Sequence, residues 1–263
     1  MTTFRDNLLA GKTAFIAGGT SGINLGIAKR FAELGAKVAV AGRDPDKAAN
    51  AAAAIGHDAI GLSGDVRDYG AIRGVMEQVV DRIGAMDIVI SGAAGNFLAP
   101  VLGMSANAFR TVVDIDLNGT FNVFRGCHDL LNRPGASLIA ITAGQAINAS
   151  ALQAHACAAK AGINQLIRVL ALEWGPDVRV NGISPGPIAG TEGMARLAPD
   201  AASRQAHFDR IAMKRWGEVE EVAESAVFLC SPAAAYITGT ILDCDGGSQI
   251  GDASRGDLSR GMA

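Results

Sequence analysis

The stretch Thr13-Ala-Phe-Ile-Ala-Gly18-Gly-Thr-Ser-Gly22-Ile-Asn24-Leu-Gly26 decides the fold. It opens with an apolar run typical of a buried strand, and a helical period begins at Ile23. The glycines between the two allow a sharp turn and a close approach to a pyrophosphate, whose charge suits a helix N-terminus. Tight turns also need glycine, so the position of this loop between the first strand and the first helix carries the prediction. It predicts a dinucleotide-binding fold.

Short apolar runs and longer helical periods alternate along the rest of the chain. The expected strands are Thr13–Ala17, Lys37–Ala41, Asp58–Leu62, Asp87–Ser91, Ser137–Ile141, Val178–Gly182 and Thr240–Asp243. The expected helices are Ile23–Leu34, Pro45–Ile55, Ala71–Ile83, Ala106–Leu131, Leu152–Trp174 and Val219–Leu229. Several strands are apolar without alternation, which is typical of a parallel sheet covered on both faces.

We therefore predict a single α/β domain over residues 1–263, a Rossmann-like, doubly wound parallel sheet of about seven strands with helices on both faces. Residues 185–210 are rich in Gly, Pro and Ala and follow the end of a strand. Such a segment is expected to act as a lid over a site.

Composition and charge narrow the classes of function. The chain has 263 residues, 49% hydrophobic and 19% charged, with a net charge of −3, which argues against nucleic acid as a partner. The cysteines form no Cys-x-x-Cys pair and the histidines have no metal-ligand spacing, so we expect reduced thiols and no metal. No apolar run reaches the length of a membrane span, the N-terminus lacks a signal peptide, and Gly-Met-Ala is not a peroxisomal address, so we expect a cytoplasmic protein.

The glycine spacing Gly18-x-x-x-Gly22 resembles the fingerprint of the short-chain dehydrogenase/reductase family. Asn24 replaces its third glycine, and we expect this asparagine to tolerate a left-handed turn. The resemblance implies that the loop binds NADP(H) or NAD(H) through Gly18, Thr20, Ser21, Gly22 and Ile23.

Arg43 follows the second strand and a small residue, where an NAD-selective protein usually carries an acid. Its guanidinium suits a 2′-phosphate, which favours NADP(H), although it is alternatively a solvated side chain paired with Asp44 or Asp46. Asp65 and Val66 resemble the contact that the family makes with the adenine edge, although Asp65 is equally suited to cap a helix.

Nearly the full chain resembles one branch of the family, the 2,4-dienoyl-CoA reductases. The resemblance rests on Ser91-Gly-Ala-Ala-Gly-Asn-Phe97, Asp114-Ile-Asp-Leu-Asn-Gly-Thr-Phe-Asn-Val123, Leu152-Gln-Ala-His-Ala156, Glu173-Trp-Gly-Pro176, Gly186-Pro-Ile-Ala-Gly-Thr-Glu-Gly193 and Asp245-Gly-Gly247. It implies contacts to the cofactor from Ala93, Ala94, Gly95, Lys160, Pro185, Gly186, Ile188 and Thr191. It also implies an acyl-CoA substrate walled by Asn96, Phe97 and Met194–Leu197, and a homotetramer or homodimer.

Lys160 occupies the place of the family's lysine, but the tyrosine expected one helical turn earlier is Ala156. A methyl group cannot transfer a proton, which argues against ordinary ketone reduction. The peroxisomal-type branch of the dienoyl-CoA reductases also lacks this tyrosine. Reduction of a conjugated thioester places hydride on the far end of the diene, so it needs a donor at the thioester oxygen and an acid near the α-carbon.

The resemblance implies that Asp116 and Lys160 are the catalytic pair; a purely structural acid is the alternative for Asp116. Asn118 is a candidate donor to the thioester oxygen unless it points outward. Gln145 stands where the mitochondrial-type branch places its tyrosine, and Ala143 replaces the family serine. His155 lies about 100° around the helix from position 156, so we expect a packing or wall role.

The sequence thus favours NADPH-dependent reduction of 2,4-dienoyl-CoA to 3-enoyl-CoA. A reductase for another conjugated carbonyl compound, or a catalytically silent NADPH-binding protein, are the alternatives.

Overall fold

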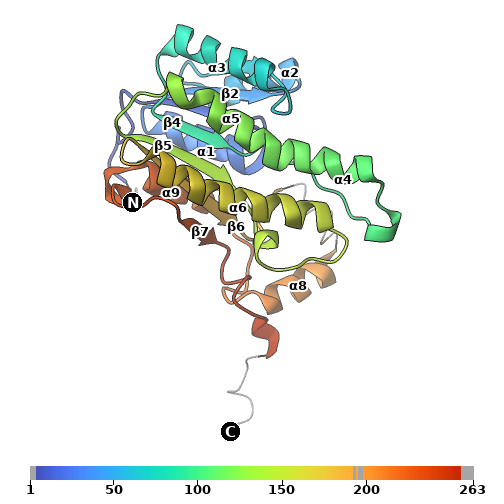
Figure 1. Ribbon diagram of the computed structural model, residues 1–263. Coiled ribbons are helices and arrows are strands. Elements are labelled where there is room, and N and C mark those ends of the chain that lie inside the picture. The colour runs from blue at the N-terminus through green and yellow to red at the C-terminus, as the bar shows by residue number, and fades with distance from the viewer. Residues whose placement is uncertain (1–3, 192–193, 195–197, 199, 256–263) are drawn as a thin grey trace.

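The computed structural model describes residues 4–191, 194, 198 and 200–255. Its centre is a parallel sheet with the strand order β3-β2-β1-β4-β5-β6-β7 (Figure 1). The strands are β1 (Thr13–Ala17), β2 (Lys37–Gly42), β3 (Ile60–Ser63), β4 (Ile88–Ser91), β5 (Ala136–Ile141), β6 (Val178–Pro185) and β7 (Ile241–Cys244). The predicted doubly wound parallel sheet is confirmed.

Helices cover both faces of the sheet. The α-helices are α1 (Gly22–Glu33), α2 (Pro45–Ile55), α3 (Tyr69–Ile83), α4 (Ala106–Val113), α5 (Gly119–Cys127), α6 (Ala154–Trp174), α8 (Ala201–Arg210) and α9 (Val219–Cys230). Shorter helical turns are η1 (Val101–Gly103), η2 (Asp114–Asn118), η3 (His128–Leu130), η4 (Gly144–Ala146), η5 (Pro232–Ala234) and η6 (Ala253–Arg255). Buried side chains of α1, α2 and α9 share one core with the sheet, while α3, α5 and α6 share the other.

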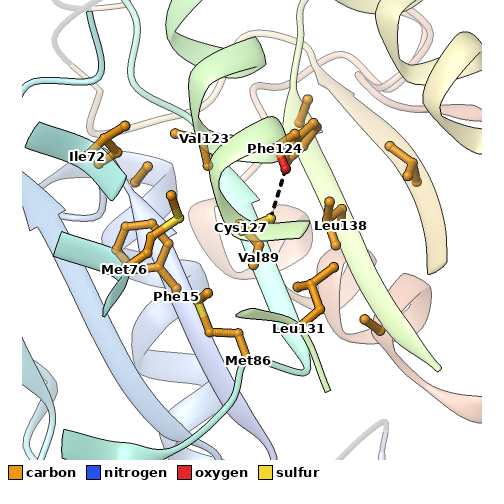
Figure 2. Close-up of a cluster of buried hydrophobic side chains, with 14 of the residues drawn as sticks. Phe15, Ile72, Met76, Met86, Val89, Val123, Phe124, Cys127, Leu131 and Leu138 are labelled. Atoms are coloured by element: carbon orange, nitrogen blue, oxygen red, sulfur yellow. Dashed lines mark hydrogen bonds between the residues drawn. The ribbon is translucent and has the colours of Figure 1, made fainter. Parts of the chain in front are cut away.

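The apolar runs carry no alternation because successive strand residues enter opposite cores: Phe15 lies in the core under α3 and α5, and Ile16 in the other. Phe15 and Val89 of the central strands meet Met76 and Phe124 of these helices (Figure 2). Cys127 lies in the same cluster, where its thiol donates to the Phe124 carbonyl and burial raises the pKa of the thiol. This cysteine is therefore packed as an inert thiol.

The boundaries differ from the predicted ones where the backbone is left-handed. His57 and Asp58 have φ values of 52° and 57°, so β3 begins after the predicted residue Asp58. Leu152 has a φ of 67°, so α6 begins two residues later than predicted. Helix α8 was not predicted; it begins at an Asp200–Ser203 capping box within the segment expected to act as a lid.

The largest difference lies between residues 106 and 131. The predicted continuous helix is divided into α4 and α5 by η2, a π-helical turn from Asp114 to Asn118. Wider turns of this kind are frequent at functional sites. Here the turn lies beside α6 and supplies the acid of the site described below.

The site lies at the carboxyl ends of the central strands. β1 pairs with β2 on one side and with β4 on the other, so the order of the strands reverses between β1 and β4. Ligands of open α/β sheets bind at such a switch point. The loops after β1 and β4 start there against the neighbouring strands: Gly18 N donates to Ala41 O of β2, and Gly92 N donates to Ala17 O of β1. Across the described residues, no helix is both long and apolar enough to cross a membrane.

Candidate active site

The loop after β1 fits a dinucleotide because it leaves no room for side chains. Gly18 has a φ of +79°, and a β-carbon there would lie 2.6 Å from the amide nitrogen of Ala93. The first loop and the loop after β4 therefore approach each other through their backbones. This is the close approach that a pyrophosphate-binding turn needs, so the residues present fit a nicotinamide dinucleotide.

Asn24 acts differently from the prediction. It lies inside α1 and is not in a left-handed turn. Its side-chain amide instead joins two loops, because Nδ2 donates to Gly92 O at 2.8 Å and to Gly18 O at 3.2 Å. Two acceptors fix which end of the amide is nitrogen, and the buried Oδ1 has no partner within the described chain. The asparagine therefore links the loop after β1 to the loop after β4.

A cavity of 370 Å³ extends from the glycine loop toward β2 and β3. Its lining includes the predicted residues Gly18, Thr20, Ser21, Arg43, Asp65, Val66, Ala93 and Ala94. Arg43 is exposed at its edge. A β-carbon at Gly42 would lie 2.7 Å from the Thr20 side chain, so an acid is poorly accommodated at that position.

Asp65 is held as an acceptor at the same cavity. Arg67 pairs with its carboxylate through the guanidinium, and this hydrogen bond lowers the pKa of Asp65. The backbone N–H of Arg67 also donates to Asp65 Oδ1. The carboxylate therefore remains charged at neutral pH and is suited to accept from an amino group.

A second cavity of 540 Å³ adjoins the first, since Asn24, Gly92 and Ala94 line both. Its lining includes the predicted residues Ile23, Gly95, Asn96, Phe97, Asp116, Lys160, Pro185, Gly186, Ile188 and Thr191. The two cavities thus bring together nearly all the predicted residues. The exceptions are Gly22, which lines neither cavity, and Asn118.

Asp116 is positioned by the π-helical turn η2. It is 1% exposed, and its Oδ1 accepts from Gly95 N at 2.7 Å. Its carbonyl oxygen accepts from the Thr120 hydroxyl at 2.7 Å, which satisfies the backbone where the winding changes. The side chain is thereby tied to the loop after β4, at the floor of the second cavity.

Lys160 reaches the same place from α6. Its Nζ lies 3.4 Å from Asp116 Oδ2 and donates to Ile141 O at 3.0 Å. Both charged groups are buried, at 8% exposure for Lys160 and 1% for Asp116. They are the only titratable side chains among the described residues that line this cavity. This pair is therefore the candidate for proton transfer in the cavity.

Ala156 lines the cavity one helical turn before Lys160. A tyrosine ring at this position would enter the cavity, and the methyl group leaves that volume open. Ala143, in place of the family serine, lines the same wall. No hydroxyl acid therefore stands at either position.

Asn118 lies away from the cavity. It is exposed, and its Nδ2 donates to Asp114 Oδ1 at 2.8 Å on the surface of the π-helical turn. Of the two orientations considered from the sequence, the structure has the outward one. The expected donor to a substrate oxygen is thus absent from this position.

Three amide side chains that sequence reasoning did not connect meet at the wall of the cavity. Asn96 Nδ2 donates to Gln153 Oε1 at 2.6 Å, and Gln145 Nε2 donates to the same oxygen at 3.4 Å. All three residues line the cavity. The available signal was the position of Gln153 three residues before Ala156, on the same helical face.

His155 is a packing residue, as predicted. It is fully buried, its ring packs edge to face against Phe97 with centroids 4.2 Å apart, and its Nδ1 accepts from Ala156 N. Thr191 donates its hydroxyl to Ile188 O at 2.8 Å, which fixes the turn after β6. Met194 lines the cavity, whereas residues 195–197 of the predicted wall lie outside the described residues. The lid role of residues 185–210 stays a prediction.

Comparison with known proteins shows the family of the chain. The family model for enoyl-(acyl carrier protein) reductases matches residues 17–249. A peroxisomal 2,4-dienoyl-CoA reductase, (3E)-enoyl-CoA-producing, of Pongo abelii is 43% identical over 253 residues, covering 94% of this chain and 87% of the relative. The chain belongs to the short-chain dehydrogenase/reductase family, among the 2,4-dienoyl-CoA reductases.

Bacterial members of the family are also similar to this reductase chain. A probable 2,4-dienoyl-CoA reductase of Bacillus subtilis, described as (2E)-enoyl-CoA-producing, is 35% identical, covering 91% of this chain and 97% of the relative. The crystal structure of a short-chain dehydrogenase from Bacillus anthracis superposes with a TM-score of 0.80 at 35% identity, covering 90% and 96% of the two chains. The predicted family and branch are confirmed.

Proposed function

We propose that this protein is an oxidoreductase that uses NADPH to reduce conjugated 2,4-dienoyl-CoA thioesters to 3-enoyl-CoA, as in the β-oxidation of unsaturated fatty acids. The names of relatives about 40% identical support the reaction. The choice of NADPH over NADH rests on Arg43 at the edge of the first cavity and on Gly42 beside it.

One observation carries the proposal: the second cavity combines the buried Asp116–Lys160 pair with a methyl group at position 156. Ketone reduction requires an acid at the reacting oxygen, and the family's tyrosine is missing there. Reduction of a dienoyl thioester requires an acid near a carbon atom, which the pair is suited to supply directly or through water. The remaining described lining is largely apolar and suits an acyl chain.

When bound, the nicotinamide supplies a hydride to the δ-carbon of the substrate. The chain's own residues bind the cofactor, deliver the proton and exclude water. Ile188 and Thr191, which line the second cavity at the turn after β6, would hold the carboxamide end of the cofactor, and Lys160 would lie beside its ribose. Asp116 holds Lys160 in place through their ion pair, and the pair delivers a proton to the α-carbon, which completes the 3-enoyl product. Phe97 walls the acyl side and excludes water.

The test is oxidation of NADPH by the purified protein with trans-2,trans-4-decadienoyl-CoA, beside NADH and a panel of saturated ketones. We expect rapid turnover with NADPH and the dienoyl thioester only, and a product whose double bond lies at carbon 3. NADPH binding without turnover would contradict the proposal and favour a silent binding protein. Turnover of a different conjugated carbonyl alone would contradict the substrate class.

We also propose a homodimer or homotetramer. Phe121 of α5 and Leu172 of α6 are exposed at 46% and 86%, and Figure 1 shows α4, α5 and α6 along one side of the molecule. Apolar residues on neighbouring helices favour a protein contact. Light scattering after size-exclusion chromatography measures the subunit number.

A cytoplasmic location remains a prediction, since several relatives are named as peroxisomal, which is a different compartment.

A further inference from the structure

The thioester oxygen of the proposed substrate needs a hydrogen-bond donor. Asn118, the donor expected from the sequence, does not line the cavity. Negative charge collects on this oxygen as hydride arrives, and donors aimed at it stabilise that charge. Asn118 lies on the exposed surface, bonded to Asp114. The Thr142 hydroxyl, which lines the cavity, donates to Asn164 Oδ1 at 2.7 Å. Neither side chain is therefore free to donate to the oxygen.

We propose that Gln153 is this donor and that it also fixes the orientation of Asn96; this inference rests on the proposed function. The Oε1 of Gln153 accepts two hydrogen bonds, from Asn96 Nδ2 and from Gln145 Nε2. Its Nε2 donates to no acceptor in the described part of the chain, yet it is not among the fully buried atoms left without a partner. It therefore reaches the surface of the cavity that Gln153 lines, with two free N–H groups.

The position of Gln153 suits this role better than the positions of its two partners. Gln153 is 9% exposed and is held by two incoming hydrogen bonds, whereas Asn96 is exposed and one of its N–H groups is already used. Gln153 stands directly before α6, three residues before Ala156 and seven before Lys160. As the N-cap residue of α6, it lines the cavity together with Ala156 and Lys160.

The loop after β4 couples the amide cluster to the acid. Gly95 N donates to Asp116 Oδ1, and the next residue, Asn96, donates to Gln153 Oε1. A substrate oxygen near Gln153 is thus positioned by the same loop that positions Asp116. A thioester oxygen only accepts hydrogen bonds. It therefore favours the amide orientation in which Gln153 Nε2 faces the substrate and Gln153 Oε1 faces Asn96 and Gln145.

Two variants separate donation from positioning. Gln153→Leu removes the whole amide. Gln153→Glu retains an oxygen that accepts from Asn96 and Gln145 but replaces the donor with a carboxylate oxygen. The same two changes at Gln165, an exposed residue of α6, are the matched controls. The measurements are kcat and KM with decadienoyl-CoA, the Kd for NADPH, and the Kd for decanoyl-CoA, a saturated thioester that cannot react.

We expect both Gln153 variants to lower kcat about 10²–10³-fold, the usual effect of losing one such donor, with the Kd for NADPH within about twofold of the wild-type value. Full activity in Gln153→Glu would overturn donation, because positioning of Asn96 alone would then suffice. If the wild-type protein does not turn over the dienoyl thioester, the proposed function fails. The affinity for decanoyl-CoA then decides the inference: binding about 2–10-fold weaker in Gln153→Leu than in Gln165→Leu supports the contact, and equal binding overturns it.

Discussion

The two cavities of the site are built by different means. The cofactor cavity depends on missing side chains: Gly18 and Gly42 bring the backbones of the loops after β1 and β2 close to their neighbours. The substrate cavity depends on side chains that are present, foremost the buried Asp116–Lys160 pair. Substitutions at the glycines of the cofactor cavity are poorly tolerated, because any side chain there would meet the neighbouring loop. In the substrate cavity a single substitution changes the chemistry: Ala156 in place of a tyrosine removes a proton donor.

The largest expected effect lies in the substrate cavity. Asp116→Asn retains an oxygen that accepts from Gly95 N but removes the charge that faces Lys160, so we expect turnover to fall about 10²–10⁴-fold. Asp114→Asn, on the same π-helical turn but outside the cavity, is the control and should remain active. Steady-state kinetics with the dienoyl thioester measure the difference, and equal rates for the two variants would remove Asp116 from proton transfer.

The next effect lies at the edge of the cofactor cavity. Arg43→Ala should raise the Kd for NADPH about 10–100-fold and leave the Kd for NADH unchanged, since the proposed partner of the guanidinium is the 2′-phosphate, which NADH lacks. Lys47→Ala removes an exposed cation of α2 nearby and controls for net charge. Calorimetry with both cofactors gives the comparison. Equal loss of affinity for NADH would show that Arg43 contributes elsewhere.

Gly18→Ala tests whether the cofactor cavity depends on the absence of side chains. Gly11 is the matched control, because it has a φ of +78° and a β-carbon added there would meet nothing within 4 Å. Both substitutions add the cost of a left-handed alanine, and only Gly18→Ala adds contact with the backbone of Ala93. We expect Gly18→Ala to lower the free energy of unfolding by about 1–3 kcal/mol more than Gly11→Ala. Denaturant titration measures both, and equal losses would contradict the close approach.

The smallest effect concerns Asn24, whose side chain links the loops after β1 and β4 and lines both cavities. Asn24→Ala removes the hydrogen bonds to Gly18 O and Gly92 O, so we expect the free energy of unfolding to fall by about 1–2 kcal/mol. Asn50→Ala, at an exposed position of α2, provides the helical control. Thermal unfolding of the protein without cofactor distinguishes them. An unchanged melting temperature in Asn24→Ala would show that the loops hold together without this amide.

The same contrast explains which features of the fold and of the site could be predicted from the sequence. Glycine positions and strand–helix alternation follow local rules, so the parallel sheet and the cofactor loop could be predicted from residue order alone. The role of Asn24 could not, because its two partners lie 6 and 68 residues away and meet only in the folded chain. The amide cluster around Gln153 likewise joins the loop after β4 to the loop after β5 and the start of α6. The outward position of Asn118 depends on the π-helical winding, which the apolar period from 106 to 131 does not reveal.

The π-helical turn also sets how this protein can change by insertion or deletion. A turn of this kind holds one residue more than an α-helical turn, so loss of a single residue between positions 114 and 118 would restore continuous α-helix through α4 and α5. Each residue contributes about 100° of rotation, and the shift would swing Asp116 out of reach of Lys160. Such a deletion would separate the acid from its ammonium partner. In this protein the number of residues between α4 and α5 is therefore as much a part of the candidate site as the identity of those residues.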